Sequence, residues 1–112
     1  MTDAQRDRLE KMSRLGKSVV FKHKGGGGHR VMGIVEDEVY VMVRDYKHMI
    51  QKIKFADGVA WDGSSHAYRT GYYTYSASKK RIVWGQYRQF LTEKEYRQLL
   101  RSAHNRGWDI FQ

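Results

Sequence analysis

The sequence predicts an α+β protein in which a small, strongly bent antiparallel sheet is flanked by an N-terminal and a C-terminal helix. Three observations predict it: capping signals with helical periodicity at both ends, alternating apolar residues between positions 16 and 87, and short connections between these runs. Consecutive hairpins that close over so few residues favour a bent sheet or partial barrel. The length of 112 residues predicts a single domain, residues 1–112.

The first predicted element is a helix over residues 3–15. Thr2 and Gln5 have the spacing of a capping box, and Gly16 is a suitable stop signal. Apolar side chains recur at about helical spacing, at Leu9, Met12 and Leu15. Because this apolar stripe is thin, we expect the helix to dock weakly or to use its basic face.

The middle of the chain predicts about six short strands. They are expected within residues 16–23, 30–45, 48–58, 68–75 and 81–87. Residues 30–45 are expected to hold two strands joined by a tight polar turn at Glu36-Asp37-Glu38. Four consecutive glycines, Gly25–Gly28, predict a hairpin loop, because glycine weakens the interior of a strand or helix.

The first two strands resemble those of SH3-like small barrels. The resemblance lies in GKSVVFKH at 16–23 and RVMGIVEDEVYVMV at 30–43, and it covers about a quarter of the chain without a signature motif. It implies an SH3-like partial barrel. It implies no particular function, because one fold can carry many functions.

The last predicted element is an amphipathic helix over residues 92–106. Thr92 and Glu95 form a second capping-box pattern, and Gly107 stands where a helix commonly ends. The apolar stripe comprises Tyr96, Leu99, Leu100 and Ala103. The residues expected to pack back onto the sheet after it are Trp108, Ile110 and Phe111.

The composition excludes several classes of protein. There is no cysteine, which excludes a disulfide framework, a thiolate zinc site and a thiol nucleophile, and which agrees with a reducing cytoplasm. No apolar run approaches the ~18 residues of a membrane span, and the N-terminus lacks the apolar region of a signal peptide. We therefore expect a cytoplasmic protein with no membrane partner.

The charge is unevenly distributed along a chain with net charge +9 and a pI near 9.9. Residues 1–24 hold seven Lys or Arg against three Asp or Glu, and residues 79–112 hold eight against three. Residues 25–78 hold six of each. Basic ends of this kind are typical of a protein that binds a polyanion, although basic surfaces also serve solubility alone.

Residues 71–87, GYYTYSASKKRIVWGQY, combine five aromatic residues with a basic tripeptide and two glycines. Alternation predicts one core face formed by Tyr73, Tyr75, Ile82 and Trp84. The opposite, open face is then formed by Tyr68, Tyr72, Arg81 and Tyr87. Such a face could stack bases, as single-stranded nucleic-acid platforms do, or could represent the aromatic packing that is common in sheets.

These observations predict a non-enzymatic nucleic-acid-binding protein without a cofactor. The residues expected to contact phosphate are Lys79, Lys80, Arg81, Arg88, Lys94, Arg97 and Arg101. Tyr72 and Tyr87 are expected to stack on or position a base. The competing interpretation is an ordinary solvated basic surface. DNA and RNA remain equally open as ligands.

Two other functions fit the sequence less well. A protein-interaction module or inhibitor would dock an acidic partner, with Trp61 in the predicted loop as an anchor. A metal-dependent nuclease would need Asp37, Asp45 and His48 to converge, yet consecutive strand residues point to opposite faces. His66 beside Ser64-Ser65 could form a nucleophile pair, but nothing in the sequence orients it. We therefore predict no catalytic or metal-binding residues.

Overall fold

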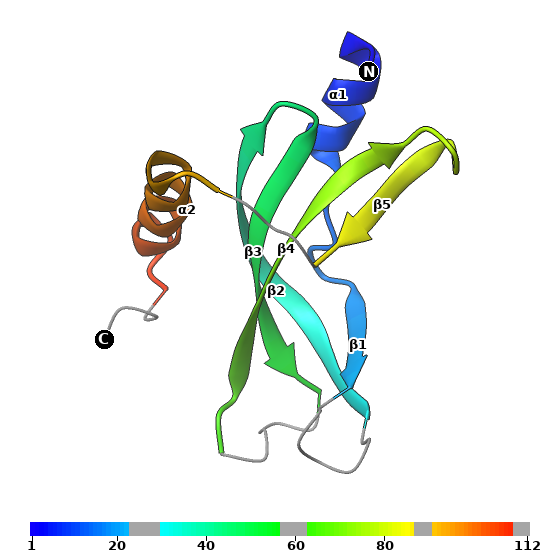
Figure 1. Ribbon diagram of the computed structural model, residues 1–112. Helices are drawn as coiled ribbons and strands as arrows, with labels where there is room; N and C mark the ends of the chain where they lie inside the picture. Colours follow the sequence, from blue (N-terminus) through cyan, green and yellow to red (C-terminus); the bar gives the residue numbers. More distant parts are fainter. Residues whose placement is uncertain (23–29, 57–62, 87–90, 109–112) are drawn as a thin grey trace. The chain divides into compact units, whose positions relative to one another are not determined.

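The computed structural model describes residues 1–22, 30–56, 63–86 and 91–108. Over these ranges the chain forms two helices and one five-stranded sheet with the strand order β1-β2-β3-β4-β5 (Figure 1). The elements in chain order are α1 (Asp3–Lys11), β1 (Ser18–Lys22), β2 (Arg30–Val43), β3 (Tyr46–Phe55), β4 (His66–Ser76), β5 (Arg81–Gly85) and α2 (Glu93–Asn105). The predicted α+β class with an antiparallel sheet between two helices in sequence is confirmed, with five strands in place of about six.

The chain divides into two compact units. The first unit comprises Met1–Met12, Val39–Ile50 and Thr70–Gln112, and the second comprises Ser13–Glu38 and Gln51–Arg69. Strands β2, β3 and β4 therefore each contribute residues to both units. Because each unit is compact by itself, the expectation of a single domain stays a prediction.

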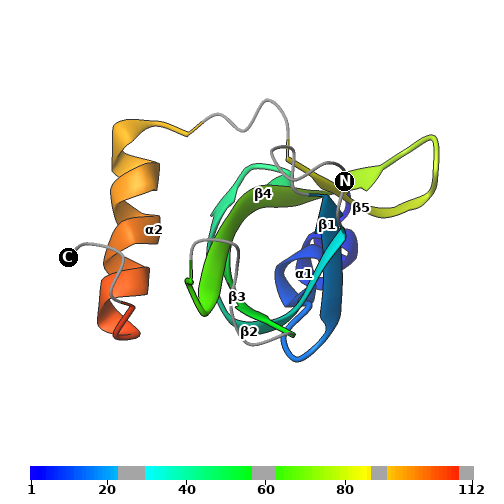
Figure 2. The same cartoon turned by 90° about the horizontal axis from the view of Figure 1, so that it is seen from below.

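In the first unit, α1 and α2 cover opposite faces of the sheet. On the α1 face, Leu9 packs with Met49 and Tyr73, and all three side chains are buried. On the α2 face, the buried cluster consists of Val39, Ile50, Leu99, Ala103 and Trp108. Met49 and Ile50 are neighbours on β3, and successive strand residues point to opposite faces. Figure 2 shows the two helices on these two sides.

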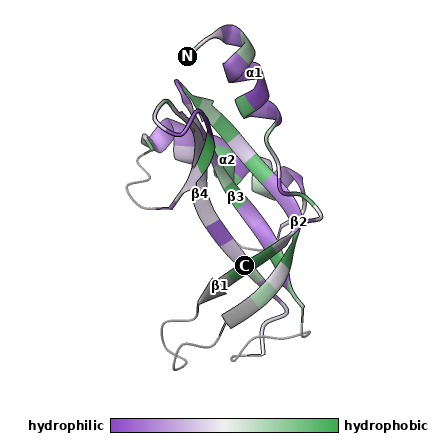
Figure 3. Cartoon of the chain, turned by 90° about the vertical axis from the view of Figure 1, so that its right-hand side faces the viewer, coloured by the Kyte–Doolittle hydropathy of each residue, from purple (hydrophilic) through white to green (hydrophobic). Residues whose placement is uncertain are grey.

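Helix α1 ends four residues earlier than the sequence predicts. Met12 caps it in an extended conformation, so Leu15 lies outside the helix and is 55% exposed. The predicted capping box is present, since Thr2 Oγ1 accepts from Gln5 N and Gln5 Oε1 accepts from Thr2 N. The helix is mostly hydrophilic (Figure 3), and Leu9 is its one buried residue.

A buried lysine anchors the C-terminal end of α1. Lys47 on β3 is only 4% exposed, and its ammonium group donates to the carbonyl oxygens of Glu10 at 2.6 Å and Met12 at 2.5 Å. The same group lies 4.4 Å from the centre of the Tyr40 ring. Because the last carbonyls of a helix lack partners within the helix, these bonds compensate the burial of the charge. Lys47 therefore holds α1 against the sheet in addition to the buried side chain of Leu9.

Strand β2 is continuous, which makes the predicted turn at residues 36–38 wrong. The chain reverses instead at Arg44 and Asp45, where Arg44 takes a left-handed backbone conformation with φ 53°. In the second unit, Val35 packs with Ile53 whereas Glu38 accepts a bond from Gln51. Residues 51 and 53 point to the same face of β3, but their partners at positions 35 and 38 are three residues apart on β2. Residues three apart in a regular strand point to opposite faces, so this pairing indicates a β-bulge between positions 35 and 38.

Glu38 is the centre of a polar network in the second unit. Its carboxylate accepts from the Ser13 hydroxyl, from Arg14 N at 3.3 Å and from Gln51 Nε2 at 2.8 Å. Gln51 is fully buried, and its Oε1 accepts from Arg69 Nε at 2.9 Å. Buried polar groups need such partners, so this network explains why a glutamate and a glutamine occupy these strand positions.

Strands β4 and β5 pair each of two glycines with an aromatic ring. Tyr72 is opposite Gly85 in the register, and a Cβ at position 85 would overlap the Tyr72 ring. A Cβ at position 71 would likewise overlap the indole ring of Trp84. The two glycines therefore allow one aromatic ring to lie flat against the hairpin on each face.

Candidate nucleic-acid interface

The tip of the β4–β5 hairpin carries the predicted basic tripeptide. Lys79 and Lys80 lie in the turn at residues 77–80, and Arg81 begins β5 opposite Ser76. All three side chains are exposed. The Ser76 hydroxyl accepts from Lys79 N at 3.3 Å, and Lys80 has a left-handed φ of 52°, so local backbone geometry positions the charges at the tip.

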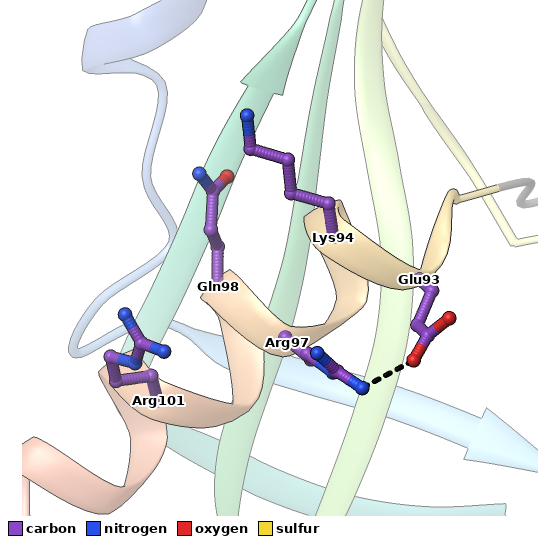
Figure 4. A pocket seen from close by; sticks show the side chains of 5 residues that line it. All are labelled: Glu93, Lys94, Arg97, Gln98 and Arg101. Atoms are coloured by element: carbon purple, nitrogen blue, oxygen red, sulfur yellow. Dashed lines mark hydrogen bonds and ion pairs between the residues drawn. The ribbon is translucent and has the colours of Figure 1, made fainter.

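A second basic surface lies on the exposed side of α2. Lys94, Arg97 and Arg101 line a shallow groove of about 360 Å³ together with Glu93 and Gln98. Figure 4 shows Lys94, Gln98 and Arg101 extending to one side of the helix, while Arg97 turns to form an ion pair with Glu93. Such an exposed pair is worth only ~0–1 kcal/mol, so the guanidinium can exchange this partner for another anion.

Most of the predicted phosphate-contacting side chains carry uncompensated charge. Among the described residues, no ion pair engages the five exposed cations Lys79, Lys80, Arg81, Lys94 and Arg101. Among the described members of this set, Arg97 alone is paired. Arg88 and Tyr87, the remaining predicted site residues of the hairpin, lie outside the described residues.

The predicted division of the β4–β5 hairpin into two faces is correct for its described residues, which end at position 86. Tyr73 is buried and meets Trp84 edge to face with ring centroids 4.9 Å apart, and Ile82 packs against the same cluster. Tyr72 is on the other face but is half-buried over Gly85. Its edge meets the Tyr46 ring at 5.4 Å between centroids. Tyr72 therefore forms part of a wall and is not the open platform that the sequence suggested.

Tyr72 belongs to an aromatic groove, which we define by its lining residues Val43, Arg44, Tyr46, His48, Tyr72, Thr92 and Glu95. The groove has a volume of about 680 Å³ and is built entirely from the first unit. Tyr46 and His48 stack with centroids 5.9 Å apart, and His48 and Tyr72 are tilted at 5.7 Å. Tyr46 remains 43% exposed.

Sequence reasoning missed Tyr46 as a candidate site residue. The available signal was the alternation of Tyr46, His48 and Ile50, which places three ring or apolar side chains on one face of a strand. Nothing local in the sequence places Thr92 and Glu95 beside that face, because the docking of α2 brings them there.

Two ionisable groups of the groove have shifted pKa values. Burial lowers the pKa of His48, and the nearby carboxylate of Glu95 opposes that effect. Hydrogen bonds from the backbone and hydroxyl of Thr92 lower the pKa of Glu95. Near neutral pH the groove therefore presents a neutral imidazole and an ionised carboxylate. The carboxylate can only accept hydrogen bonds.

The carboxylates and histidines do not form a metal centre in the described ranges. No group of three His, Asp or Glu side chains there could hold a metal ion. Asp37 accepts from Glu38 N at 2.9 Å on β2, whereas Asp45 lies in the following turn. Lys47, which lies between Asp45 and His48 in the sequence, binds the end of α1.

A short chain of hydrogen bonds joins Ser65, His66 and Glu36 in the second unit. Ser65 Oγ lies 2.8 Å from His66 Nδ1, and His66 Nε2 lies 3.0 Å from Glu36 Oε2. Glu36 also lies 3.9 Å from the Lys52 ammonium group. These hydrogen bonds orient the His66 ring, which could not be predicted from the sequence. The Ser65 side chain is exposed, so solvent competes for these hydrogen bonds.

The predicted anchor Trp61 and the loop Gly25–Gly28 lie outside the described residues. Neither described helix is long and apolar enough to cross a lipid bilayer. Comparison of the chain with models of protein families, with curated proteins and with solved structures finds no match in any of the three.

Proposed function

We propose that this protein binds nucleic acid without catalysing a reaction on it. The observation that carries the proposal is the pair of exposed basic surfaces at the hairpin tip and on α2, where five cations have no ion-pair partner among the described residues. Exposed and unpaired cations are available for phosphate oxygens. The net charge of +9 adds a long-range attraction to any polyanion.

The mechanism is electrostatic. Each phosphate that a lysine or arginine neutralises releases condensed counterions, so affinity falls steeply as salt concentration rises. Lys79, Lys80, Arg81 and the basic side chains of α2 would supply these contacts, with Arg88 beside them in sequence. Tyr72 and Tyr87 would help to position bases. We place this binding in the cytoplasm, as the cysteine-free composition favours.

The test is a fluorescence-anisotropy titration with short single- and double-stranded DNA and RNA at two salt concentrations. Wild type is compared with a hairpin variant, Lys79→Ala/Lys80→Ala/Arg81→Ala. We expect the hairpin variant to bind each preferred ligand more weakly, and both proteins to lose affinity at the higher salt concentration.

The matched control removes the same charge elsewhere. In Arg8→Ala/Lys11→Ala/Lys17→Ala, three exposed cations without ion pairs in the described ranges are lost from the N-terminal region. The control should retain more affinity than the hairpin variant. Equal losses would mean that net charge alone drives binding. Absence of binding to all four nucleic acids by wild type would overturn the proposal.

The same unpaired cations favour a second candidate, an acidic protein partner. Charge complementarity would then set the association rate and the choice of partner. Affinity capture from a lysate with and without nuclease treatment separates the two functions. A specific acidic protein that remains bound after nuclease treatment, together with no direct binding to purified nucleic acid, would favour this second function.

A further inference from the structure

The aromatic groove has the features of a ligand site that the basic surfaces do not explain. Its volume of about 680 Å³ lies within the ~300–1,000 Å³ that is typical of small-molecule sites. Three aromatic rings from β3 and β4 form its walls, and polar groups from the β2–β3 turn and from α2 line it. Sites of this kind combine an apolar surface with a few directional polar groups.

The three aromatic residues of the groove differ in how exposed they are to a ligand. His48 is only 5% exposed, and Tyr72 is held over Gly85 with its edge toward Tyr46. Tyr46 is 43% exposed and is the most exposed of the three residues. A flat ligand can therefore stack on Tyr46, whereas the other two rings fix the position of that ring.

The polar groups narrow the chemistry of the ligand. Glu95 Oε1 accepts from Thr92 N at 2.8 Å, and the Thr92 hydroxyl also bonds to this carboxylate, so the capping box orients it. An ionised carboxylate has about four acceptor sites, so Glu95 can also accept from an exocyclic amino group. Arg44 is exposed at the same groove and can donate to a phosphate. A flat ring, an amino group and a phosphate occur together in a nucleotide.

We propose that the aromatic groove takes one unpaired nucleobase of a bound strand, which stacks on Tyr46 and presents an amino group to Glu95. This inference rests on the proposed function and adds to it a contact that depends on the base. Adenine, cytosine and guanine carry exocyclic amino groups and thymine does not, so the groove disfavours thymine. Tyr46 is a binding residue in this proposal, and Tyr72 is a positioning residue.

The test compares a single-stranded oligonucleotide of cytosines with an abasic strand of the same length at constant salt. Loss of a stacking side chain typically lowers affinity by about 5- to 150-fold per base. We therefore expect Tyr46→Ala to weaken binding to the cytosine strand by an amount in this range and to leave binding to the abasic strand unchanged. Tyr46→Phe, which keeps the ring, should bind like wild type.

Two controls make the result specific. Tyr96→Ala removes a tyrosine that is equally exposed, at 48%, on α2 outside the groove, and it should change neither affinity. Glu95→Gln keeps the capping pattern but loses the ionised acceptor, so it should reduce the preference for cytosine over thymine strands. Unchanged binding of the abasic strand by Tyr46→Ala also shows that this variant is folded.

The outcomes separate the two proposals. If wild type binds neither strand, the proposed function itself is wrong. If wild type binds both strands and Tyr46→Ala changes both affinities equally or neither, only the groove proposal is wrong. Cytidine monophosphate that binds the groove as tightly as the strand would overturn the assignment to a strand and identify a site for free nucleotides.

Discussion

At the scale of single residues, His48 couples the aromatic groove to pH. The side chain is 5% exposed between Tyr46 and Tyr72, and burial lowers its pKa below 6.5. The charged groups of the groove are Glu95, which partly opposes the shift, and Arg44. The folded protein therefore disfavours the protonated imidazole relative to the unfolded chain.

The sign of the resulting pH dependence follows from proton binding. Below pH 6.5 the unfolded chain takes up a proton at His48 that the folded protein does not yet accept, so the free energy of unfolding decreases as the pH falls. The decrease stops once the pH is below the folded pKa. Urea denaturation at several pH values between 7.5 and 5 should show it. His48→Gln should reduce this slope.

A second contribution comes from Glu95, but it falls in a different pH range. The hydrogen-bonded carboxylate of Glu95, whose lowered pKa lies below 4.5, contributes its own loss of stability only at more acidic pH. Equal slopes in wild type and His48→Gln would contradict the assignment to His48.

At the scale of elements, the β4–β5 hairpin depends on its two glycines. In Gly85→Ala the added methyl group would overlap the Tyr72 ring, and that ring also contacts Tyr46 and His48. Overpacking of this kind typically costs ~1–3 kcal/mol. We expect Gly85→Ala to lower the free energy of unfolding by this amount in urea denaturation.

A double-mutant cycle tests the cause. If the cost comes from the Tyr72 ring, then Gly85→Ala made in the background of Tyr72→Ala should cost much less than it does in wild type, because the obstructing ring is absent. Equal costs in both backgrounds would show that the backbone of β5, and not the ring, requires glycine.

The elements also show which signals in a sequence are reliable. Both capping boxes, Thr2 with Gln5 and Thr92 with Glu95, were predicted and are present, because a cap involves residues only three positions apart. The turn predicted at residues 36–38 was wrong. Three consecutive acidic residues indicate an exposed turn when only the local sequence is considered. The partners that Glu38 finds, among them Ser13 and Gln51, are distant in the sequence.

At the scale of the whole molecule, charge placement gives a quantitative prediction. For single-stranded nucleic acid, the logarithm of the binding constant changes with the logarithm of salt concentration by ~0.7 per neutralised phosphate. If Lys79, Lys80 and Arg81 each contact one phosphate, the hairpin variant should reduce the magnitude of this slope by ~2. The N-terminal control variant should not, although its net charge is the same.

Only part of the candidate site could be predicted from the sequence. The exposure of the hairpin tip and of the α2 cations was predictable, because turns and the polar side of an amphipathic helix face solvent. The aromatic groove was not, since it needs Tyr46 and Tyr72 on neighbouring strands and Glu95 on a helix that docks against them. Those proximities arise from tertiary packing.

The lysine that anchors α1 has a consequence for the chemical reactivity of the protein. Acylating reagents attack an unprotonated and accessible amine, whereas Lys47 is only 4% exposed and its ammonium group donates to two carbonyl oxygens. Lys11, Lys17, Lys79, Lys80 and Lys94 are exposed and should be modified first. Modification of Lys47 then requires α1 to detach, so its labelling rate reports how often the N-terminal helix opens in the native protein.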